Sequence, residues 1–328
     1  MDGKLVHRDD GFYSCYRSDG GMLQREYLKT RDNTLYYFNS KGIGVEIAYT
    51  FISEHVIQIF DNLVDSSFLV LGSKGAAVID GMNGTVDLSV LARQFTDLPL
   101  TAIATHGHGD HVGGLQNFKE VHVNQADFDL FRDHSSADLR FGFLSYDNYK
   151  RETGSTLDYT LVNLREDFLE KNDALRLIPL EDGETFDLGG VAVECIAVPG
   201  HTPGSMAILV KEDRLLITGD AANRFTMIAG CPVEAYLRSL QKLKARETEY
   251  DAVYASHAAL KDGKNSGRLS DTVIDELIEG CQSILNGENE GVAPEPGVPV
   301  RWAYTMGPSG RADGKCGNFM FNPKLIRL

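Results

Sequence analysis

The chain has 328 residues, of which 42% are hydrophobic and 24% are charged, values that exclude a largely disordered chain. The 47 acidic residues outnumber the 32 basic ones and give a formal net charge of -15. Because such a surface repels a polyanion, we expect no nucleic-acid partner.

Regular apolar patterning begins at about Glu54. Three short apolar runs typical of β-strands, at 56–60, 67–71 and 76–80, predict a meander of adjacent strands. Residues 86–95 then fit an amphipathic helix, and the apolar run 98–104 leads directly into a cluster of histidines. Downstream, the pattern predicts strands near Val121 and at 191–198, 206–210, 214–217 and 252–255, and helices at 233–246 and 271–285.

Three segments flank or interrupt this pattern. Residues 1–53 form an N-terminal extension that we expect to pack on a core at 54–265. Residues 125–172 have helical character and predict an inserted cap, whose aromatic side chains either line an apolar pocket or pack a helical hairpin. Residues 266–328 supply a C-terminal helix and a tail, including a linker at 291–299 and a strand or two, that complete the same domain.

The sequence also bears on location and cysteine chemistry. The first residues lack the apolar run of a signal peptide, and no stretch approaches the roughly 20 apolar residues that cross a bilayer. We therefore expect a cytoplasmic protein with no membrane partner. Five scattered cysteines without a CxxC spacing predict reduced thiols rather than a disulfide framework or a thiolate metal site. The oligomeric state is left open, with a homodimer among the options.

Residues 105–111 read Thr-His-Gly-His-Gly-Asp-His, and they concentrate three of the nine histidines within six residues. Neutral imidazole and carboxylate are ligands that zinc prefers alongside thiolate, and two histidines one residue apart can point the same way to share one ion. Gly107 and Gly109 permit the tight backbone that this requires. For the motif alone, a solvated Gly/His loop is the alternative.

Three later strand-like runs also end in candidate ligands. His201 lies in the turn-rich segment 198–205, Asp220 follows an apolar run, and His257 ends another. Taken singly, the histidines fit ordinary loop residues and Asp220 fits a turn or helix N-cap. Together with the first cluster, however, they bring metal-ligand chemistry to the ends of four strand-like runs, where α/β layers assemble their sites.

This order of motifs, HxHxDH, then PGHTPGS, TGD and a strand-end histidine, resembles the metallo-β-lactamase-fold superfamily, close to its glyoxalase II-like hydrolase branch. The resemblance spans about residues 56–257 and implies an α/β fold, an αββα sandwich, with N- and C-terminal extensions. All seven expected ligand positions are filled. The ligands it implies are His106, His108 and His201 for a first metal, Asp110, His111 and His257 for a second, and Asp220 as the bridge between them.

The resemblance also assigns residues around the metals. Asp80 matches the aspartate of an early strand motif that orients the ligand loop from outside the coordination sphere, although a strand-end turn explains it as well. Asn223, Arg224 and Phe225 follow Asp220 on a loop that faces the metals, and they are candidate substrate contacts. Helix-start capping and loop solvation are the alternative for these three residues.

The activity implied is metal-dependent hydrolysis of a small-molecule ester, thioester or lactone. Two divalent ions, with zinc expected and iron or manganese as the alternatives, would share a hydroxide that attacks the carbonyl carbon. Asp220 and Asp110 are the catalytic candidates. Asp220 would bridge the two ions, and either one of the ions or Asp110 would help the leaving group depart. The alternatives are a phosphodiesterase of the same fold and a mononuclear-iron sulfur oxygenase resembling persulfide dioxygenases.

Differences between this sequence and other members of the superfamily make some of their activities less expected here. Zinc β-lactamases generally carry Cys or Ser near the position of Asp220, and diiron flavoproteins carry Glu in place of His108, so β-lactam hydrolysis and oxygen reduction are disfavoured. The C-terminal tail lacks a basic cluster that matches the glutathione-binding region of glyoxalase II. The sequence therefore predicts a site and a reaction class, and it leaves the substrate unidentified.

Overall fold

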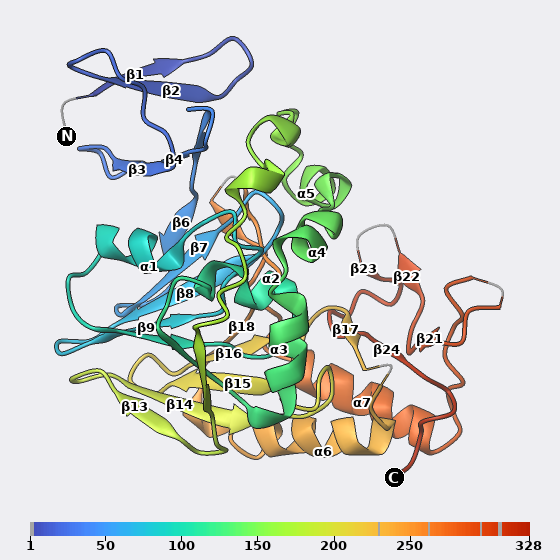
Figure 1. The fold of residues 1–328 in the computed structure, drawn as a ribbon. Helices are drawn as coiled ribbons and strands as arrows, with labels where there is room; N and C mark the ends of the chain where they lie inside the picture. The colour runs from blue at the N-terminus through green and yellow to red at the C-terminus, as the bar shows by residue number, and fades with distance from the viewer. Residues whose placement is uncertain (1–2, 229, 262, 296, 308–309) are drawn as a thin grey trace.

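Two β-sheets packed face to face form the centre of the computed structural model, which describes residues 3–228, 230–261, 263–295, 297–307 and 310–328 (Figure 1). The first sheet has seven strands in the order β12-β11-β10-β9-β8-β7-β6, and the second has five in the order β13-β14-β15-β16-β18. Strands β7, β8 and β9 pair as the predicted antiparallel meander, whereas β9 to β12 run parallel. The first sheet consists of β6 (Tyr49–Phe51), β7 (Val56–Phe60), β8 (Ser66–Leu71), β9 (Ala76–Ile79), β10 (Leu100–Ile103), β11 (Glu120–Val123) and β12 (Arg176–Pro179), and the second of β13 (Thr185–Asp187), β14 (Ala192–Ala197), β15 (Met206–Val210), β16 (Leu215–Gly219) and β18 (Ala252–Ala255).

Apolar side chains from both sheets fill the space between them. Phe68 and Ile79 of the first sheet share one buried cluster with Ile208 and Ile217 of the second. Strands buried on both faces carry nearly continuous apolar runs, as β15 and β16 do. This inner layer is the part of the fold that the strand pattern predicted most directly.

Helices cover the outer face of each sheet. On the second sheet, α6 (Val233–Lys244) and α7 (Val273–Leu285) bury their apolar sides against residues such as Leu216 and Val253. On the first, α1 (Leu88–Leu91) continues as the 3-10 turn η1 (Ala92–Gln94), so the helix expected at 86–95 is shorter than predicted. The order helix, sheet, sheet, helix confirms the αββα sandwich.

Residues 3–46 form a separate antiparallel sheet in the order β1-β2-β5-β4-β3, for which the sequence had suggested no strands. A small apolar cluster that includes Cys15, Leu23 and Phe38 packs inside it. This sheet also contacts the cap, because Asn39 Nδ2 donates to the carbonyl of Leu161 at 3.1 Å. Its strands are β1 (Gly3–His7), β2 (Tyr13–Arg17), β3 (Glu26–Lys29), β4 (Leu35–Phe38) and β5 (Gly44–Glu46).

The segment 125–172 is helical, as expected, and sits over the strand ends on the first sheet's side (Figure 1). The fully buried Arg140 anchors it, donating to the carbonyls of Asn83, Ser135 and Leu169. The elements of this cap are η3 (Gln125–Asp127), α3 (Phe128–His134), α4 (Ala137–Gly142), α5 (Tyr146–Thr153), η4 (Tyr159–Leu161) and η5 (Arg165–Asp167).

Two strands of the C-terminal tail join a small third sheet rather than either central one, and the tail's other two described strands pair with each other. In the third sheet, β24 (Phe319–Phe321) pairs in parallel with β17 (Thr226–Met227), the segment that follows Asp220, and antiparallel with β21 (Arg301–Trp302). The tail therefore supports a loop beside the predicted metal ligands. The remaining described elements are α2 (Gly109–Val112), η2 (Gly113–Leu115), η6 (Glu247–Glu249), β19 (Leu260–Lys261), β20 (Lys264–Asn265), β22 (Met306–Gly307) and β23 (Gly310–Arg311).

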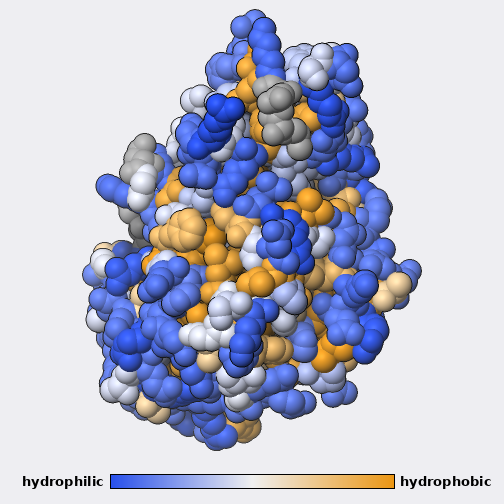
Figure 2. All heavy atoms as spheres, turned by 90° about the vertical axis from the view of Figure 1, so that its left-hand side faces the viewer, coloured by the Kyte–Doolittle hydropathy of each residue, from blue (hydrophilic) through white to orange (hydrophobic). Residues whose placement is uncertain are grey.

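The face drawn in Figure 2 is largely hydrophilic, with apolar side chains gathered across its middle. Among the described helices, none combines the length and apolar character needed to cross a membrane.

Candidate metal centre

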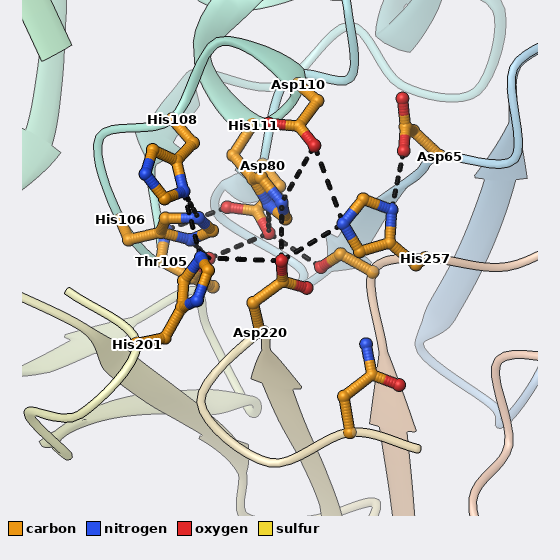
Figure 3. A network of polar contacts seen from close by, with 12 residues as sticks. Asp65, Asp80, Thr105, His106, His108, Asp110, His111, His201, Asp220 and His257 are labelled. Atoms are coloured by element: carbon orange, nitrogen blue, oxygen red, sulfur yellow. Dashed lines mark hydrogen bonds and ion pairs between the residues drawn. The ribbon is translucent and has the colours of Figure 1, made fainter. Parts of the chain in front are cut away.

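Four segments far apart in the sequence bring their polar ends together at one edge of the two sheets (Figure 3). The loop after β10 carries His106, the loop between β14 and β15 carries His201, and Asp220 and His257 follow β16 and β18. Because β16 and β18 are parallel neighbours, their carboxyl ends lie side by side. The site is therefore built from both sheets, on a frame of buried strands.

Three histidines form the first group of candidate ligands. His106 Nε2 lies 3.0 Å from His108 Nδ1, which lies 2.9 Å from His201 Nε2. Burial lowers the pKa of His106 well below its usual value, and burial beside His201 lowers the pKa of His108 to about 4. Both imidazoles are therefore neutral at pH 7, with nitrogen lone pairs available to a metal ion.

Asp110, His111 and His257 form the second group. Asp110 Oδ2 lies 3.5 Å from His257 Nε2 and 3.9 Å from His111 Nε2. Burial alone would lower the pKa of both histidines, but carboxylates around them, including Asp220, raise it well above the usual value. The surroundings thus favour positive charge at this position, and a metal cation would displace the protons.

Asp220 lies between the two groups. Its Oδ2 is 3.0 Å from His257 Nε2, 3.7 Å from His111 Nε2 and 3.6 Å from His201 Nε2. Burial would raise the pKa of this carboxyl group, but His257 and His111 hold it well below its usual range. Asp220 is therefore an anion placed to contact ions held by either group.

Two buried atoms of the cluster have no hydrogen-bond partner among the described residues, His111 Nε2 and Asp220 Oδ1. A buried polar atom without a partner is costly, so each such atom needs an explanation. Divalent metal ions supply one, because imidazole nitrogen and carboxylate oxygen are ligands suited to them. The trios of ligand atoms close enough to hold an ion are His106, His108 and His201; His106, His111 and Asp220; and Asp110, His111 and His257.

Hydrogen bonds behind the ligands orient them. Asp80 Oδ2 lies 2.9 Å from His111 Nδ1, and the same carboxylate accepts from the backbone and hydroxyl of Thr105 and from Ser256. His201 Nδ1 lies 2.8 Å from the carbonyl oxygen of Met227. Fixing one ring nitrogen in this way directs the other toward the cluster. Asp80 thus has the contacts expected of a residue that orients the ligand loop.

Sequence reasoning missed two buried carboxylates at this site. Asp65, in the loop between β7 and β8, lies with Oδ1 2.8 Å from His257 Nδ1. Asp127, at the start of the cap, accepts from Gly107 N at 3.0 Å, Thr202 Oγ1 at 2.6 Å and Gly204 N at 2.8 Å. Each looked like an ordinary polar loop residue in the sequence, and no local signal separates them from solvated aspartates.

A cavity of about 360 Å³ opens beside the ligands His108, Asp110 and His257. The cap contributes Phe143, Leu144 and Arg151 to its lining, so residues 125–172 do cover part of the site.

The loop after Asp220 adds Arg224 and Phe225, two of the three proposed substrate contacts. The third, Asn223, is not among the residues that line this cavity. Its side chain is buried, and its Oδ1 accepts from the backbone nitrogen of Arg224 at 2.7 Å.

Comparisons with known proteins find relatives that are named as hydrolases. The chain is 30% identical to the acyl-coenzyme A thioesterase MBLAC2 of Gallus gallus over 54% of its own length and 65%, just under two thirds, of that protein. It is 30% identical to the probable polyketide biosynthesis zinc-dependent hydrolase BaeB of Bacillus velezensis, over 59% of the chain and 72% of that protein. The hydroxyacylglutathione hydrolase GloC of Haemophilus influenzae is 27% identical, over 45% of the chain and 61% of that protein.

A family match covers the same part of the chain as the site. The model of the metallo-beta-lactamase superfamily matches residues 61–257, more than half of the sequence, and includes every candidate ligand from His106 to His257. The superfamily generally binds divalent metals, in accord with the ligand groups described above. This chain belongs to the metallo-β-lactamase superfamily.

Proposed function

We propose that the protein is a metal-dependent hydrolase with two metal ions, zinc in both positions, that cleaves a small-molecule thioester. The observation that carries this proposal is the position of Asp220 Oδ2, within 3.0 to 3.7 Å of histidines from both ligand groups. One three-histidine group and one group containing Asp110 then share a single carboxylate. A site for a single ion would have no need for this second set.

The side chains divide the work as follows. His106, His108 and His201 would hold one ion, Asp110, His111 and His257 the other, and Asp220 would bridge them. When bound, such ions lower the pKa of a coordinated water and polarise a carbonyl or phosphoryl oxygen. Asp110 is one-third exposed toward the cavity, where it can accept a proton and return it to the departing group.

Substrate class rests on the relatives and on the cavity. Two of the related proteins are named for thioester cleavage, one acting on acyl-coenzyme A and one on hydroxyacylglutathione. They support the hydrolase branch of the superfamily for this chain. Lactones and simple esters present the same carbonyl chemistry and belong in the same test, as do phosphodiesters. The substrate is a small molecule that fits a cavity of about 360 Å³.

The experiment combines elemental analysis of the freshly purified protein with a hydrolysis screen of thioesters, lactones, aryl esters and phosphodiesters. We expect two zinc ions per chain, thioester cleavage, and loss of both with a chelator followed by recovery with added zinc. One iron per chain, with oxygen consumed in the presence of a persulfide, would instead make the protein an oxygenase. Turnover of phosphodiesters alone would overturn the substrate class.

Asp65→Asn is expected to weaken metal binding without unfolding the protein. The substitution keeps the shape of the side chain but removes the charge that holds His257 Nδ1, and loss of such an outer partner costs about 10 to 100-fold in metal affinity or activity. Zinc affinity, measured by competition with a chromophoric chelator, tests this. Asp213→Asn is the matched control, because Asp213 makes a similar contact with His55, at 2.8 Å, outside the metal centre. Equal zinc affinity in both variants would show that Asp65 does not contribute to metal binding.

A further inference from the structure

The cavity contains an arginine whose charge is not paired. Arg224 lines the cavity four residues after Asp220, and its Nε is buried without a hydrogen-bond partner among the described residues. No carboxylate within the described part of the chain forms an ion pair with its guanidinium group. Arg151, which lines the same cavity, differs because it is mostly exposed and lies 3.7 Å from Glu152.

Two arginines of the described residues, Arg140 and Arg311, are buried and have partners, whereas Arg224 is half-buried. Arg140 donates to three backbone carbonyls, and Arg311 pairs with Asp313. Burying a charged group is costly unless it is paired and hydrogen-bonded. Arg140 Nε is also buried without a partner, but its two terminal nitrogens are bonded, whereas the side chain of Arg224 has no hydrogen bond or ion pair within the described residues. An anion from outside the chain would supply the missing partner for the guanidinium group.

The backbone around Arg224 is held in place. Its amide donates to Asn223 Oδ1, the amide of Asn223 donates to Thr226 Oγ1 at 3.0 Å, and β17 then pairs with β24. The C-terminal tail thus fixes the loop that presents the guanidinium group. A side chain whose backbone is already ordered loses less entropy when it binds a ligand.

Apolar side chains lie beside this charge. Phe225 and Phe143 line the same cavity and are 42% and 63% exposed, and Leu144 lines it as well. The guanidinium group recognises carboxylate and phosphate groups through paired N–H donors. The phenyl rings, by contrast, favour contact with the apolar part of a ligand. A ligand that satisfies both has an anionic group next to an apolar part.

We propose that Arg224 determines specificity by binding an anionic group, a carboxylate or a phosphate, of the substrate. The inference rests on the proposed function, since it concerns the thioester that the same cavity accepts. The anion lies either on the acyl part, as a carboxylate, or on the thiol part, as a phosphate.

Two pairs of substrates distinguish these sources. S-Acetyl-4′-phosphopantetheine and S-acetyl-pantetheine share the thioester and the pantetheine arm and differ in one phosphate. The S-(4-nitrophenyl) monothioester of succinate has a free carboxylate, whereas the same thioester of monomethyl succinate has a neutral methyl ester in its place. We expect the protein to prefer the anionic member of one pair, and that pair identifies the group that Arg224 binds.

Arg224→Gln should remove this preference. A hydrogen bond to a charged group contributes about 1.5 to 3 kcal/mol, which corresponds to a fall of roughly 10 to 150-fold in kcat/KM for the anionic substrate. We expect the change mainly in KM, because the contact lies away from the reacting carbonyl. The neutral partner should change by less than about threefold, and Arg224→Lys should retain part of the preference, since a single ammonium replaces paired donors.

Arg238→Gln is the control, because Arg238 lies on α6, is exposed and pairs with Glu234 outside the cavity. Equal losses for the charged and neutral members in Arg224→Gln would overturn the proposal and make the residue structural. So would the absence of any preference in the unchanged protein.

Calorimetry separates this proposal from the proposed function. If no thioester is cleaved, binding of 4′-phosphopantetheine, pantetheine and succinate to the zinc-loaded protein still tests Arg224. Tighter binding of 4′-phosphopantetheine than of pantetheine, or measurable binding of succinate, that is lost in Arg224→Gln supports the anion site even when the hydrolase assignment fails. Binding that is absent, or equal in both proteins, overturns it.

Discussion

Asp220→Ala is expected to lower metal content and turnover together. The side chain lies between the two ligand groups and contacts histidines of both, so its removal leaves neither ion with its shared anion. Loss of outer partners already costs about 10 to 100-fold, and a direct ligand should cost at least about 100-fold in kcat/KM. Zinc per chain by elemental analysis and turnover of a responsive thioester, measured on the same preparation, provide the test.

Asp251→Ala is the control for this substitution. Asp251 precedes β18 at the end opposite His257, and it forms an exposed ion pair with Arg214. Exposed pairs contribute about 0 to 1 kcal/mol, so the control should keep its metal and activity. If Asp220→Ala retained full zinc content and full activity toward every responsive substrate, the bridging role and the two-metal proposal would both fail.

Asp127→Ala is expected to lower stability and metal affinity, although Asp127 touches no ion ligand through its side chain. Its carboxylate joins the loop of His106 and His108 to the loop of His201 through three buried hydrogen bonds. Each buried donor left unpaired costs about 1 to 3 kcal/mol, so the free energy of unfolding should fall by several kcal/mol. Looser loops would also weaken zinc binding, by about 10 to 100-fold. Chemical denaturation and chelator competition measure the two effects.

Two further variants make the role of Asp127 specific. Asp127→Asn keeps the volume of the side chain but replaces one acceptor with a donor, so it should recover part of the stability and less of the zinc affinity. Asp129→Asn, two residues away and exposed, should match the unchanged protein in both measurements. A normal zinc affinity in a folded Asp127→Ala protein would show that the two ligand loops keep their positions without this carboxylate.

The N-terminal sheet illustrates a limit of pattern reasoning. Its strands are three to five residues long, and several side chains of β2, β4 and β5 are exposed or only half-buried. The alternation of apolar and polar residues is therefore too short to distinguish a strand from a loop. Long-range contacts decide the matter, such as Phe12 and Leu35 joining the cluster that contains Ile57 and Val78 of the first sheet.

The cavity likewise depends on tertiary structure. Arg224 and Phe225 reach it, whereas the neighbouring Asn223 turns into a buried backbone contact. From the sequence alone, these three consecutive residues were equally good candidates for substrate contacts. The pairing of β17 with β24 from the C-terminal tail sets the turn that separates them, and the two strands lie more than ninety residues apart in the chain, between Met227 and Phe319.

Local sequence determined which residues carry the chemistry and where they stand on the strands. Continuous apolar runs define the buried strands, and His106, His201, Asp220 and His257 come shortly after the ends of four of them, so their convergence followed from the layered fold. The fold and the superfamily are confirmed, whereas the ligand roles stay predictions for the experiments above.

Only the tertiary structure revealed Asp65 and Asp127, whose partners are distant in sequence and whose burial no local pattern reports. Side-chain hydrogen bonds between loops depend on how whole layers pack, and this packing is a property of the complete chain.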